Sequence, residues 1–167
     1  MPLVRGPPDP HTRPVPVLAS LARRLGGLRA FALVGRAYVP LDRWLGRLSR
    51  GRLLALGLPS LILTTTGRRS GEPRTTPLLF ARDADAFVVI GSNWGQPGHP
   101  GWSANLLANP EASVQVGGEH IAVRGRLVEG AERDRLRELL LQVWPAYAAY
   151  ERRAQGRNLR LFRLERA

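Results

Sequence analysis

The sequence predicts a mainly β protein of the α+β class, in which about six antiparallel strands close into a small barrel with helices at its periphery. From residue 60 onward the chain contains six short segments that are typical of extended backbone. Short glycine-rich or polar links between some of these segments indicate hairpins, and therefore mostly antiparallel pairing. The length of 167 residues suits one domain with a substantial core. Six short antiparallel strands are best closed into a barrel.

The chain before residue 59 differs in composition from the rest. Residues 1–16 hold six of the fourteen prolines and almost no apolar bulk, which predicts a disordered tail. They also lack the apolar run of a secretory signal, so we expect a cytoplasmic protein. Residues 17–58 form a basic segment with two amphipathic helix patterns, at 17–28 and 41–50, and residues 59–167 form the predicted barrel domain.

The clearer of these helix patterns, residues 41–50, has two interpretations. Leu41, Trp44, Leu45 and Leu48 share one helical face, and three arginines share the opposite face. An apolar stripe backed by arginines can rest on an anionic membrane, here the inner face of the cell membrane, with the tryptophan at headgroup depth. The same pattern is typical of a surface helix packed on a soluble domain. No segment reaches the ~20 apolar residues needed to cross a bilayer.

The predicted strands follow one another along the barrel domain. Gly117 and Gly118 are a two-residue hairpin signal, and residues 82–85 predict a polar turn. The strands are predicted at residues 60–66, 75–81, 86–92, 112–116, 119–129 and 159–165.

Two predicted helices interrupt the strands. The segment 101–108 is short and follows a loop rich in glycine and proline. The segment 131–143 places four apolar residues on one helical face, and Pro145 ends or kinks it. Tyr147 and Tyr150 then follow at one-turn spacing, which places them on the same side of the chain.

The composition excludes several kinds of chemistry. The chain has no cysteine, which removes disulfides, thiolate nucleophiles and cysteine-ligated zinc or iron–sulfur sites. All 25 basic residues are arginine, so no lysine can act as a Schiff base or amine base. The common catalytic, zinc and nucleotide-binding motifs are absent, we predict no metal site, and His99 is a lone loop histidine of the kind that more often has no role. This profile suits a protein that holds a reactive cofactor, because the cofactor then carries the chemistry.

The motif TTTGRRSGEPRTTPL, residues 64–78, predicts a hairpin whose tip gathers Arg68, Arg69 and Arg74. Backbone amides of a glycine-rich turn and several arginine forks can bind phosphate or several carboxylates, and the bound anion offsets the repulsion among the arginines. A solvated basic turn is the alternative interpretation. The loop GSNWGQPGHPGW, residues 91–102, leads into a helix N-terminus, which is a further anion-binding element and supports the anion site.

Five motifs occur in a characteristic order: TTTGRRSGEPRTTPL, IGSN, HPGWSANLLANP, GAERDRL and WPAYAAY. Through them the chain, over about residues 36–167, resembles the deazaflavin-dependent nitroreductase family of actinobacteria. The resemblance implies a split β-barrel of the kind that also binds FMN in related proteins. It also implies that coenzyme F420, a 5-deazaflavin with a phosphate and a polyglutamate tail, is bound and serves in reduced form as a hydride donor. Such a polyanion suits clustered arginines that bind it bidentately.

The resemblance also implies site residues, position by position. The hairpin turn corresponds to the grip on the phosphate and acidic tail, and the later positions line the deazaflavin. Three aromatic positions correspond to residues that cover the coenzyme and act in catalysis. The coenzyme-binding residues so implied are Arg68, Arg69, Ser70, Gly71, Arg74, Pro77, Ile90, Gly91, Ser92, Asn93, Gly101, Trp102 and Asn105. The implied catalytic residues are Trp144, Tyr147 and Tyr150, and the acceptor pocket adds Leu79 and Ser92.

The sequence departs from the family pattern near the implied acceptor pocket. Leu79 stands in place of an aromatic residue, Trp144 in place of a tyrosine, Ser103 and Ala104 in place of a bulky pair, and Trp94 is an addition. The hydroxyls lost at Leu79 and Trp144 would have been donors to a nitro group or a quinone oxygen. We therefore expect a quinone-like acceptor, with a nitro-aromatic compound as the alternative, and do not assume that bicyclic nitroimidazoles are substrates.

Other partners and activities follow from the same features. A related barrel that uses FMN would need fewer arginines for its single phosphate. A non-catalytic protein could sequester F420 or dock on anionic lipid through residues 1–58, which hold ten arginines and two acidic residues. We expect no nucleic-acid partner, because residues 68–74 have no aromatic neighbour closer than Phe80. A homodimer is expected from the resemblance alone.

Overall fold

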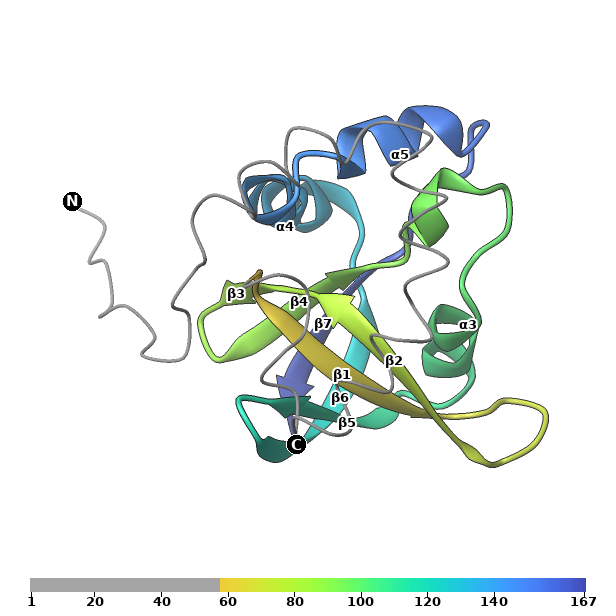
Figure 1. The fold of residues 1–167 in the computed structure, drawn as a ribbon, viewed down its shortest axis with the longest axis vertical. Helices are drawn as coiled ribbons and strands as arrows, with labels where there is room; N and C mark the ends of the chain where they lie inside the picture. The colour runs from red at the N-terminus through yellow and green to blue at the C-terminus, as the bar shows by residue number, and fades with distance from the viewer. Residues whose placement is uncertain (1–57) are drawn as a thin grey trace.

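The structure, a computed structural model, describes residues 58–167 (Figure 1). The predicted tail at residues 1–16 and the helix patterns at 17–28 and 41–50 lie outside the described residues. The strands are β1 Ser60–Thr66, β2 Pro73–Leu79, β3 Ala81–Asp83, β4 Ala86–Ile90, β5 Glu111–Val116, β6 Glu119–Leu127 and β7 Leu161–Arg166. The helices are η2 Asn93–Gly95, which is a single 3-10 turn, α3 Gly101–Ala108, α4 Gly130–Val143 and α5 Tyr147–Arg153.

The seven strands belong to one antiparallel sheet with the order β2-β1-β5-β6-β7-β4-β3. β2 and β3 stand at opposite ends of this order, yet only Phe80 separates them in the chain. The sheet therefore curls until its two edges meet at Phe80, and β2 and β3 are the two halves of one bent strand (Figure 1). The predicted mainly β barrel of about six antiparallel strands is confirmed, and the bend accounts for the seventh strand.

The ends of several strands differ from the prediction. β2 covers residues 73–79 rather than 75–81, because it pairs with β1 along the full seven residues of both strands. Arg82 and Asp83 were expected in a turn but lie in β3, where they pair with β4. β4 ends at Ile90 rather than at residue 92, because the chain then enters η2.

The inside of the barrel is filled by apolar side chains. Phe87 and Val89 of β4 point into it, and so do Phe162 and Leu164 of β7, as the two-residue period of a strand requires. Phe80 packs edge-on against Phe87, with ring centroids 5.4 Å apart, and so fills the place where the sheet edges meet. The barrel core consists of Leu61, Leu63, Phe80, Phe87, Val89, Trp102, Leu106, Val114, Val123, Phe162 and Leu164.

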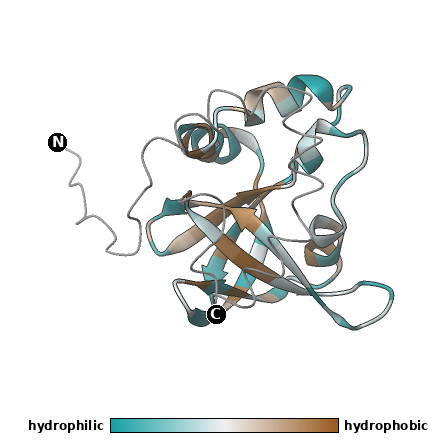
Figure 2. Ribbon diagram, viewed as in Figure 1, coloured by the Kyte–Doolittle hydropathy of each residue, from teal (hydrophilic) through white to brown (hydrophobic). Residues whose placement is uncertain are grey.

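The helices α4 and α5 lie on one side of the barrel (Figure 1), and a second apolar cluster, the outer cluster, lies between them and the strands. Val88 and Ile90 of β4 point to this side, so β4 is buried on both faces along its whole length. Leu136 and Leu140, one turn apart on α4, supply the helical side. Figure 2 shows hydrophobic residues concentrated on the strands, whereas the tip of the β1–β2 hairpin is hydrophilic. Among residues 58–167 no helix combines the length and apolar character that a bilayer crossing needs.

Candidate functional site

The β1–β2 hairpin has a tightly closed turn at its exposed tip. The N–H of Gly67 donates to the carbonyl of Glu72 at 2.8 Å, and the N–H of Gly71 donates to the carbonyl of Gly67 at 2.7 Å. Gly71 has a φ of 71°, a left-handed conformation that favours glycine, and no heavy atom lies within 4 Å of the position a Cβ would take. The turn is therefore well defined, and among the described residues none crowds the Cβ position of Gly71.

Three arginines, Arg68, Arg69 and Arg74, lie at this tip. Within residues 58–167, Arg68, Arg69 and Arg74 form no salt bridge. Nη2 of Arg74 donates to Oγ of Ser70 at 3.4 Å, and the same oxygen accepts from the N–H of Glu72 at 3.3 Å. With respect to the described part of the chain, these exposed guanidiniums have donors available for bidentate hydrogen bonds with phosphate or carboxylate oxygens.

Asn105 of α3 ties this hairpin to the body of the barrel. Its Oδ1 accepts a hydrogen bond from the N–H of Arg68 at 3.1 Å, and its Nδ2 donates to Oγ1 of Thr65 at 3.1 Å. Asn105 is 7% exposed and Thr65 is 1% exposed, so the bond between them is buried, while the bond from Arg68 is partly buried. The structure thus brings together two of the predicted coenzyme residues, Arg68 and Asn105.

Two close contacts seat α3 on the barrel. Trp102 packs on Phe162 in the barrel core, with ring centroids 5.6 Å apart. Gly125 of β6 leaves room for Leu106, because a Cβ at this glycine would lie 3.0 Å from Cδ2 of Leu106. The two predicted coenzyme residues at the start of α3 therefore differ in placement, since Gly101 is exposed whereas Trp102 is buried.

The loop of residues 91–100, here called the β4–α3 loop, has an unusual backbone. Asn93, Trp94 and Gly95 have consecutive positive φ angles of 46°, 56° and 77°. This conformation is uncommon for residues other than glycine and costs energy at the first two. Gly95 packs against α5, since a Cβ there would lie 2.9 Å from the carbonyl oxygen of Tyr150. The loop is therefore held in one specific shape against α5.

Arg157, between α5 and β7, binds the backbone of this loop. Its guanidinium donates to the carbonyls of Gly91 at 3.1 Å, Ser92 at 2.9 Å and Gln96 at 2.8 Å. Sequence reasoning did not identify this residue, because its partners are main-chain atoms 61 to 66 residues earlier. No local pattern in the sequence could have indicated them.

His99 completes the surroundings of this guanidinium. Its Nδ1 lies 3.2 Å from Nη1 of Arg157. Burial, together with the charges of Arg160 and Arg157, lowers the pKa of His99 below its ordinary value of 6.5. The imidazole is therefore neutral at pH 7, and its Nδ1 can accept a hydrogen bond from Arg157.

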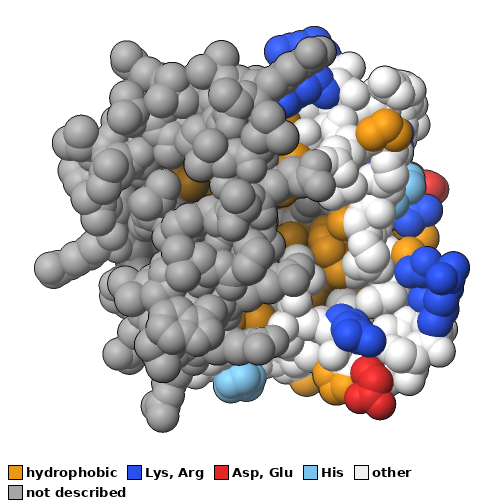
Figure 3. Space-filling view, turned by 45° about the vertical axis from the view of Figure 1, so that its right-hand side comes forward, with side chains coloured by type: hydrophobic (Ala, Val, Ile, Leu, Met, Phe, Trp, Pro, Cys, Tyr) orange, Lys and Arg blue, Asp and Glu red, His pale blue; other side chains and the backbone are white. Residues whose placement is uncertain are grey.

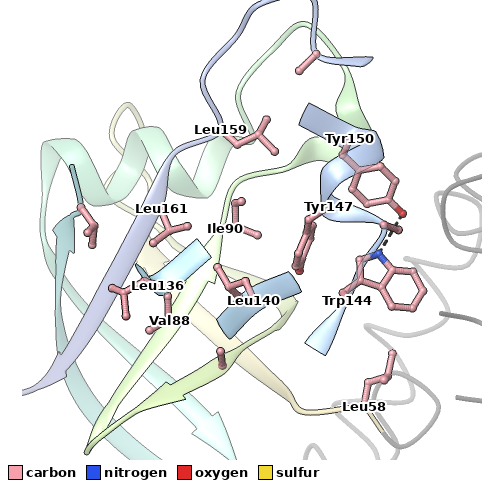
Figure 4. Packing of buried hydrophobic residues seen from close by; sticks show 14 residues of the cluster. Leu58, Val88, Ile90, Leu136, Leu140, Trp144, Tyr147, Tyr150, Leu159 and Leu161 are labelled. Carbon is pink, nitrogen blue, oxygen red and sulfur yellow. Dashed lines mark hydrogen bonds between the residues drawn. The ribbon is translucent and has the colours of Figure 1, made fainter. Parts of the chain in front are cut away.

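The three predicted catalytic residues, Trp144, Tyr147 and Tyr150, lie together in the outer cluster (Figure 4). Nε1 of Trp144 donates to the hydroxyl of Tyr150 at 3.3 Å, and both side chains are buried. Tyr147 packs edge-on against Tyr150 with centroids 6.0 Å apart, and Trp94 of the β4–α3 loop lies 5.9 Å from the Tyr150 ring. Burial raises the pKa of both tyrosines, so both hydroxyls are protonated at neutral pH.

Strand β2 runs from the cationic hairpin tip to the outer cluster, which contains the three aromatic residues just described. Pro77 and Leu79 lie on the same face of the strand, and Leu79 packs against the outer cluster. From Pro73 at the tip to Leu79 the strand extends about 20 Å, at ~3.3 Å per residue. On the face drawn in Figure 3, groups of arginine side chains lie near exposed apolar side chains. The arrangement offers a cationic end and an apolar end to an elongated ligand.

Comparisons with known proteins identify the relatives of this chain. The family model of the F420H(2)-dependent quinone reductases matches residues 40–165. An F420H(2)-dependent quinone reductase of Mycobacterium tuberculosis (strain ATCC 25618 / H37Rv) is 43% identical over 76 residues, which are 46% of this chain and 51% of that protein. The chain therefore spans about half the length of the curated relatives it matches.

Solved structures of related proteins share the fold. The structure of an F420-H2 dependent reductase is 34% identical, with a TM-score of 0.60, over 64% of this chain and 94% of that one. A structure described as a domain-swapped dimer is 30% identical, with a TM-score of 0.62, over 79% of this chain and 98% of that one. These similarities confirm the split β-barrel and the predicted F420-dependent relationship. Since the family model also covers most of the sequence, the chain belongs to the F420H(2)-dependent quinone reductase family.

Proposed function

We propose that this protein is a reductase that uses reduced F420 as hydride donor and a quinone-like compound as acceptor. The observation that carries the proposal is the hairpin tip, where Arg68, Arg69 and Arg74 lack a carboxylate partner within residues 58–167. A phosphate and a polyglutamate tail would supply the opposite charge. The family name states the same coenzyme and acceptor class.

The residues present fit such a coenzyme in shape and polarity. The cationic tip and the apolar end of β2, about 20 Å apart along the strand, match a molecule with a polyanionic tail and a ring system. Asn105 fixes the base of the cationic tip relative to α3. We propose that the phosphate and tail bind Arg68, Arg69, Ser70, Gly71 and Arg74. The ring system would lie against Pro77, Ile90, Gly91, Ser92, Asn93, Gly101 and Asn105, with Trp102 supporting α3 from the barrel core.

When bound, the reduced coenzyme supplies a hydride, and a hydride plus a proton converts a quinone to a hydroquinone. The residues of this chain would orient the acceptor and exclude water. Leu79 and Trp144 supply apolar contacts. The hydroxyl of Tyr147 forms no hydrogen bond within residues 58–167, and its raised pKa keeps it protonated. It can therefore donate a hydrogen bond to an acceptor oxygen, while Tyr150 is held by Trp144.

Binding of F420 is tested by quenching of the fluorescence of the coenzyme. We expect the wild-type chain to bind, and Arg68→Ala, Arg69→Ala and Arg74→Ala each to bind about tenfold more weakly or worse, since a hydrogen bond to a charged group is worth ~1.5–3 kcal/mol. Arg166→Ala, at an exposed arginine on β7, is the control. Failure of the wild-type chain to quench would reject the proposal. Visible absorbance of a bound flavin would favour FMN instead.

The acceptor class is tested by turnover with the reduced coenzyme. We expect oxidation of F420H2 in the presence of a small naphthoquinone such as menadione, and slower oxidation with a nitro-aromatic compound. Faster turnover of the nitro compound would reverse the proposed preference. Binding of F420 without turnover of either class would indicate a sequestering protein rather than a reductase.

We also propose a homodimer in the cytoplasm that rests on the inner face of the cell membrane. A related structure is described as a domain-swapped dimer, which supports the proposed homodimer. The amphipathic pattern of residues 41–50, outside the described residues, supports the proposed position on the membrane. A protein in that position would have access to quinones dissolved in the bilayer. Light scattering would report the mass in solution, and co-sedimentation with vesicles of phosphatidylglycerol or phosphatidylcholine would report charge-dependent membrane binding.

A further inference from the structure

We propose that Arg157 is a positioning residue of the coenzyme site, which fixes the β4–α3 loop in the shape that coenzyme binding requires. The inference rests on the proposed function, because it assigns a role within that same site. Arg157 lies outside the five sequence motifs and outside every helix and strand of the structure. Its importance follows from its contacts alone.

The guanidinium of Arg157 spans more than half of the loop. Nη1 donates to the carbonyl of Gly91 at 3.1 Å, and Nη2 donates to the carbonyl of Ser92 at 2.9 Å. Nε and Nη2 both donate to the carbonyl of Gln96, at 3.1 and 2.8 Å. One side chain thus makes four hydrogen bonds with the backbone and relates the first residue of the loop to its sixth.

The loop carbonyls compensate the positive charge of Arg157, as an acidic side chain would do. Within residues 58–167, Arg157 forms no salt bridge, and burial lowers its pKa. A partly buried charge must be compensated by hydrogen bonds, and here the partners are main-chain dipoles whose positions define the path of the loop. Lysine could not reproduce this role, because an ammonium lacks the planar, five-donor fork.

The loop needs such support because its own backbone conformation is unfavourable. Asn93 and Trp94 are both left-handed, at φ of 46° and 56°. Conformations of this kind persist only when the surrounding contacts determine them. Gly91, Ser92 and Asn93 are also predicted coenzyme residues, so the strained part of the loop directly follows the proposed ring-binding part and shares Asn93 with it. Loss of Arg157 would therefore remove the hydrogen bonds that support the strained residues and the proposed ring-binding residues of the loop.

The segment that carries Arg157 also contacts the end of α5, the helix that holds the proposed acceptor residues Tyr147 and Tyr150. The N–H of Arg157 donates to the carbonyl of Ala154 at 3.0 Å, just after α5. Gly95 of the loop packs against the backbone of Tyr150 in α5. Arg157 therefore lies where the loop and the helix carrying the proposed acceptor tyrosines meet, and its loss affects the geometry between coenzyme and acceptor.

The test compares Arg157→Ala and Arg157→Lys with Arg133→Ala in the full chain. Arg133 is a matched control, because its Nη2 also donates to a carbonyl of the α5–β7 segment, that of Leu159 at 3.4 Å, but has no bond to the loop. Affinity for F420 is measured by fluorescence quenching, kcat and KM with menadione as acceptor, and folding by thermal unfolding. Arg157→Lys serves for the binding measurement if the alanine variant does not fold.

We expect Arg157→Ala to weaken F420 binding by at least about tenfold and Arg157→Lys to weaken it less, while Arg133→Ala binds as the wild type does. A purely structural role predicts instead a lower melting temperature and a smaller active fraction, with an unchanged dissociation constant. That result, or equal affinity for Arg157→Ala and Arg133→Ala, would overturn the inference. Absence of binding by the wild-type chain would reject the proposed function itself, so the two failures are distinguishable.

Discussion

Oδ1 of Asn105 accepts a hydrogen bond from the backbone N–H of Arg68 at 3.1 Å, across 37 residues of sequence. The same side chain donates to Oγ1 of Thr65, so a single buried amide joins α3 to the base of the cationic hairpin tip. An amide suits this place because it is both donor and acceptor. The position of the arginines therefore depends on α3 as well as on their own turn.

Replacement of this amide tests that dependence. We expect Asn105→Leu to lower the free energy of unfolding by about 2 kcal/mol, at ~1 kcal/mol for each hydrogen bond lost. F420 binding should weaken as well, because the tip is no longer fixed. Urea unfolding and coenzyme titration measure the two effects. Leu107→Ala, at an exposed position of the same helix, is the control, and equal results for the two variants would contradict the argument.

Two glycines of the β4–α3 loop, Gly95 and Gly98, should respond differently to alanine. At Gly95 a Cβ would lie 2.9 Å from the carbonyl oxygen of Tyr150, and φ is 77°. We expect Gly95→Ala to destabilise the protein by about 2 kcal/mol or more, because clash and backbone strain add. A Cβ at Gly98 meets nothing within 4 Å, so Gly98→Ala should be close to neutral. Similar urea midpoints for both variants would mean that the loop does not pack tightly on α5.

His99 should make stability depend on pH near neutrality. Its pKa in the folded protein is lower than the ordinary value of 6.5, so the unfolded chain binds the proton more readily. The stabilisation is present above about pH 6.5 and is lost as the pH falls through the folded-state value. Thermal unfolding between about pH 7.5 and pH 5 measures this loss.

A histidine-to-asparagine pair identifies the group responsible. Asparagine keeps a hydrogen-bonding group near the position of Nδ1 but does not titrate, so we expect His99→Asn to reduce the loss of stability toward pH 5. His120→Asn, at an exposed position of β6, is the control for replacing a histidine by asparagine. A profile altered more by the second variant would assign the effect elsewhere.

Salt should weaken coenzyme binding if the hairpin tip binds a polyanion. Exposed charges are screened over about 8 Å at 0.15 M salt and about 3 Å at 1 M salt. We expect the affinity for F420 to fall steadily with sodium chloride, and the slope to be smaller for Arg69→Ala than for the wild type. Arg166→Ala should keep the wild-type slope. A salt-independent affinity would show that the exposed arginines do not contact the coenzyme.

Local sequence patterns were sufficient to predict the bounds of an element when residues close to it in the sequence determine where it begins and ends. The bounds of β1 and α3 were predicted as they occur, since a turn sequence follows the first, and Pro100 and Pro110 enclose the second. The bend at Phe80 could not be predicted in the same way. It arises because one half of the strand pairs with β1 and the other half with β4, and such pairing depends on remote parts of the chain.

In the candidate site, too, local sequence patterns did not indicate contacts that depend on remote parts of the chain. The arginine tip was predicted because its three cations and its turn residues lie within one short motif. Arg157 was not, because its partners are carbonyl groups of a distant loop. The spacing of Tyr147 and Tyr150 placed them on the same side of the chain, but it did not indicate that Trp144 would donate to the Tyr150 hydroxyl within an apolar cluster. Burial of that group depends on how α4 and α5 pack on β4.

β4 is shared by the two hydrophobic cores, with Phe87 and Val89 facing the barrel and Val88 and Ile90 facing the helices. Neither core can melt while the other stays intact, so the two should unfold as one cooperative unit. Amide protons of β4 should exchange with deuterium only through global unfolding, whereas those of the hairpin tip should exchange rapidly. The β4–α3 loop is therefore attached to the strand that we expect to exchange most slowly.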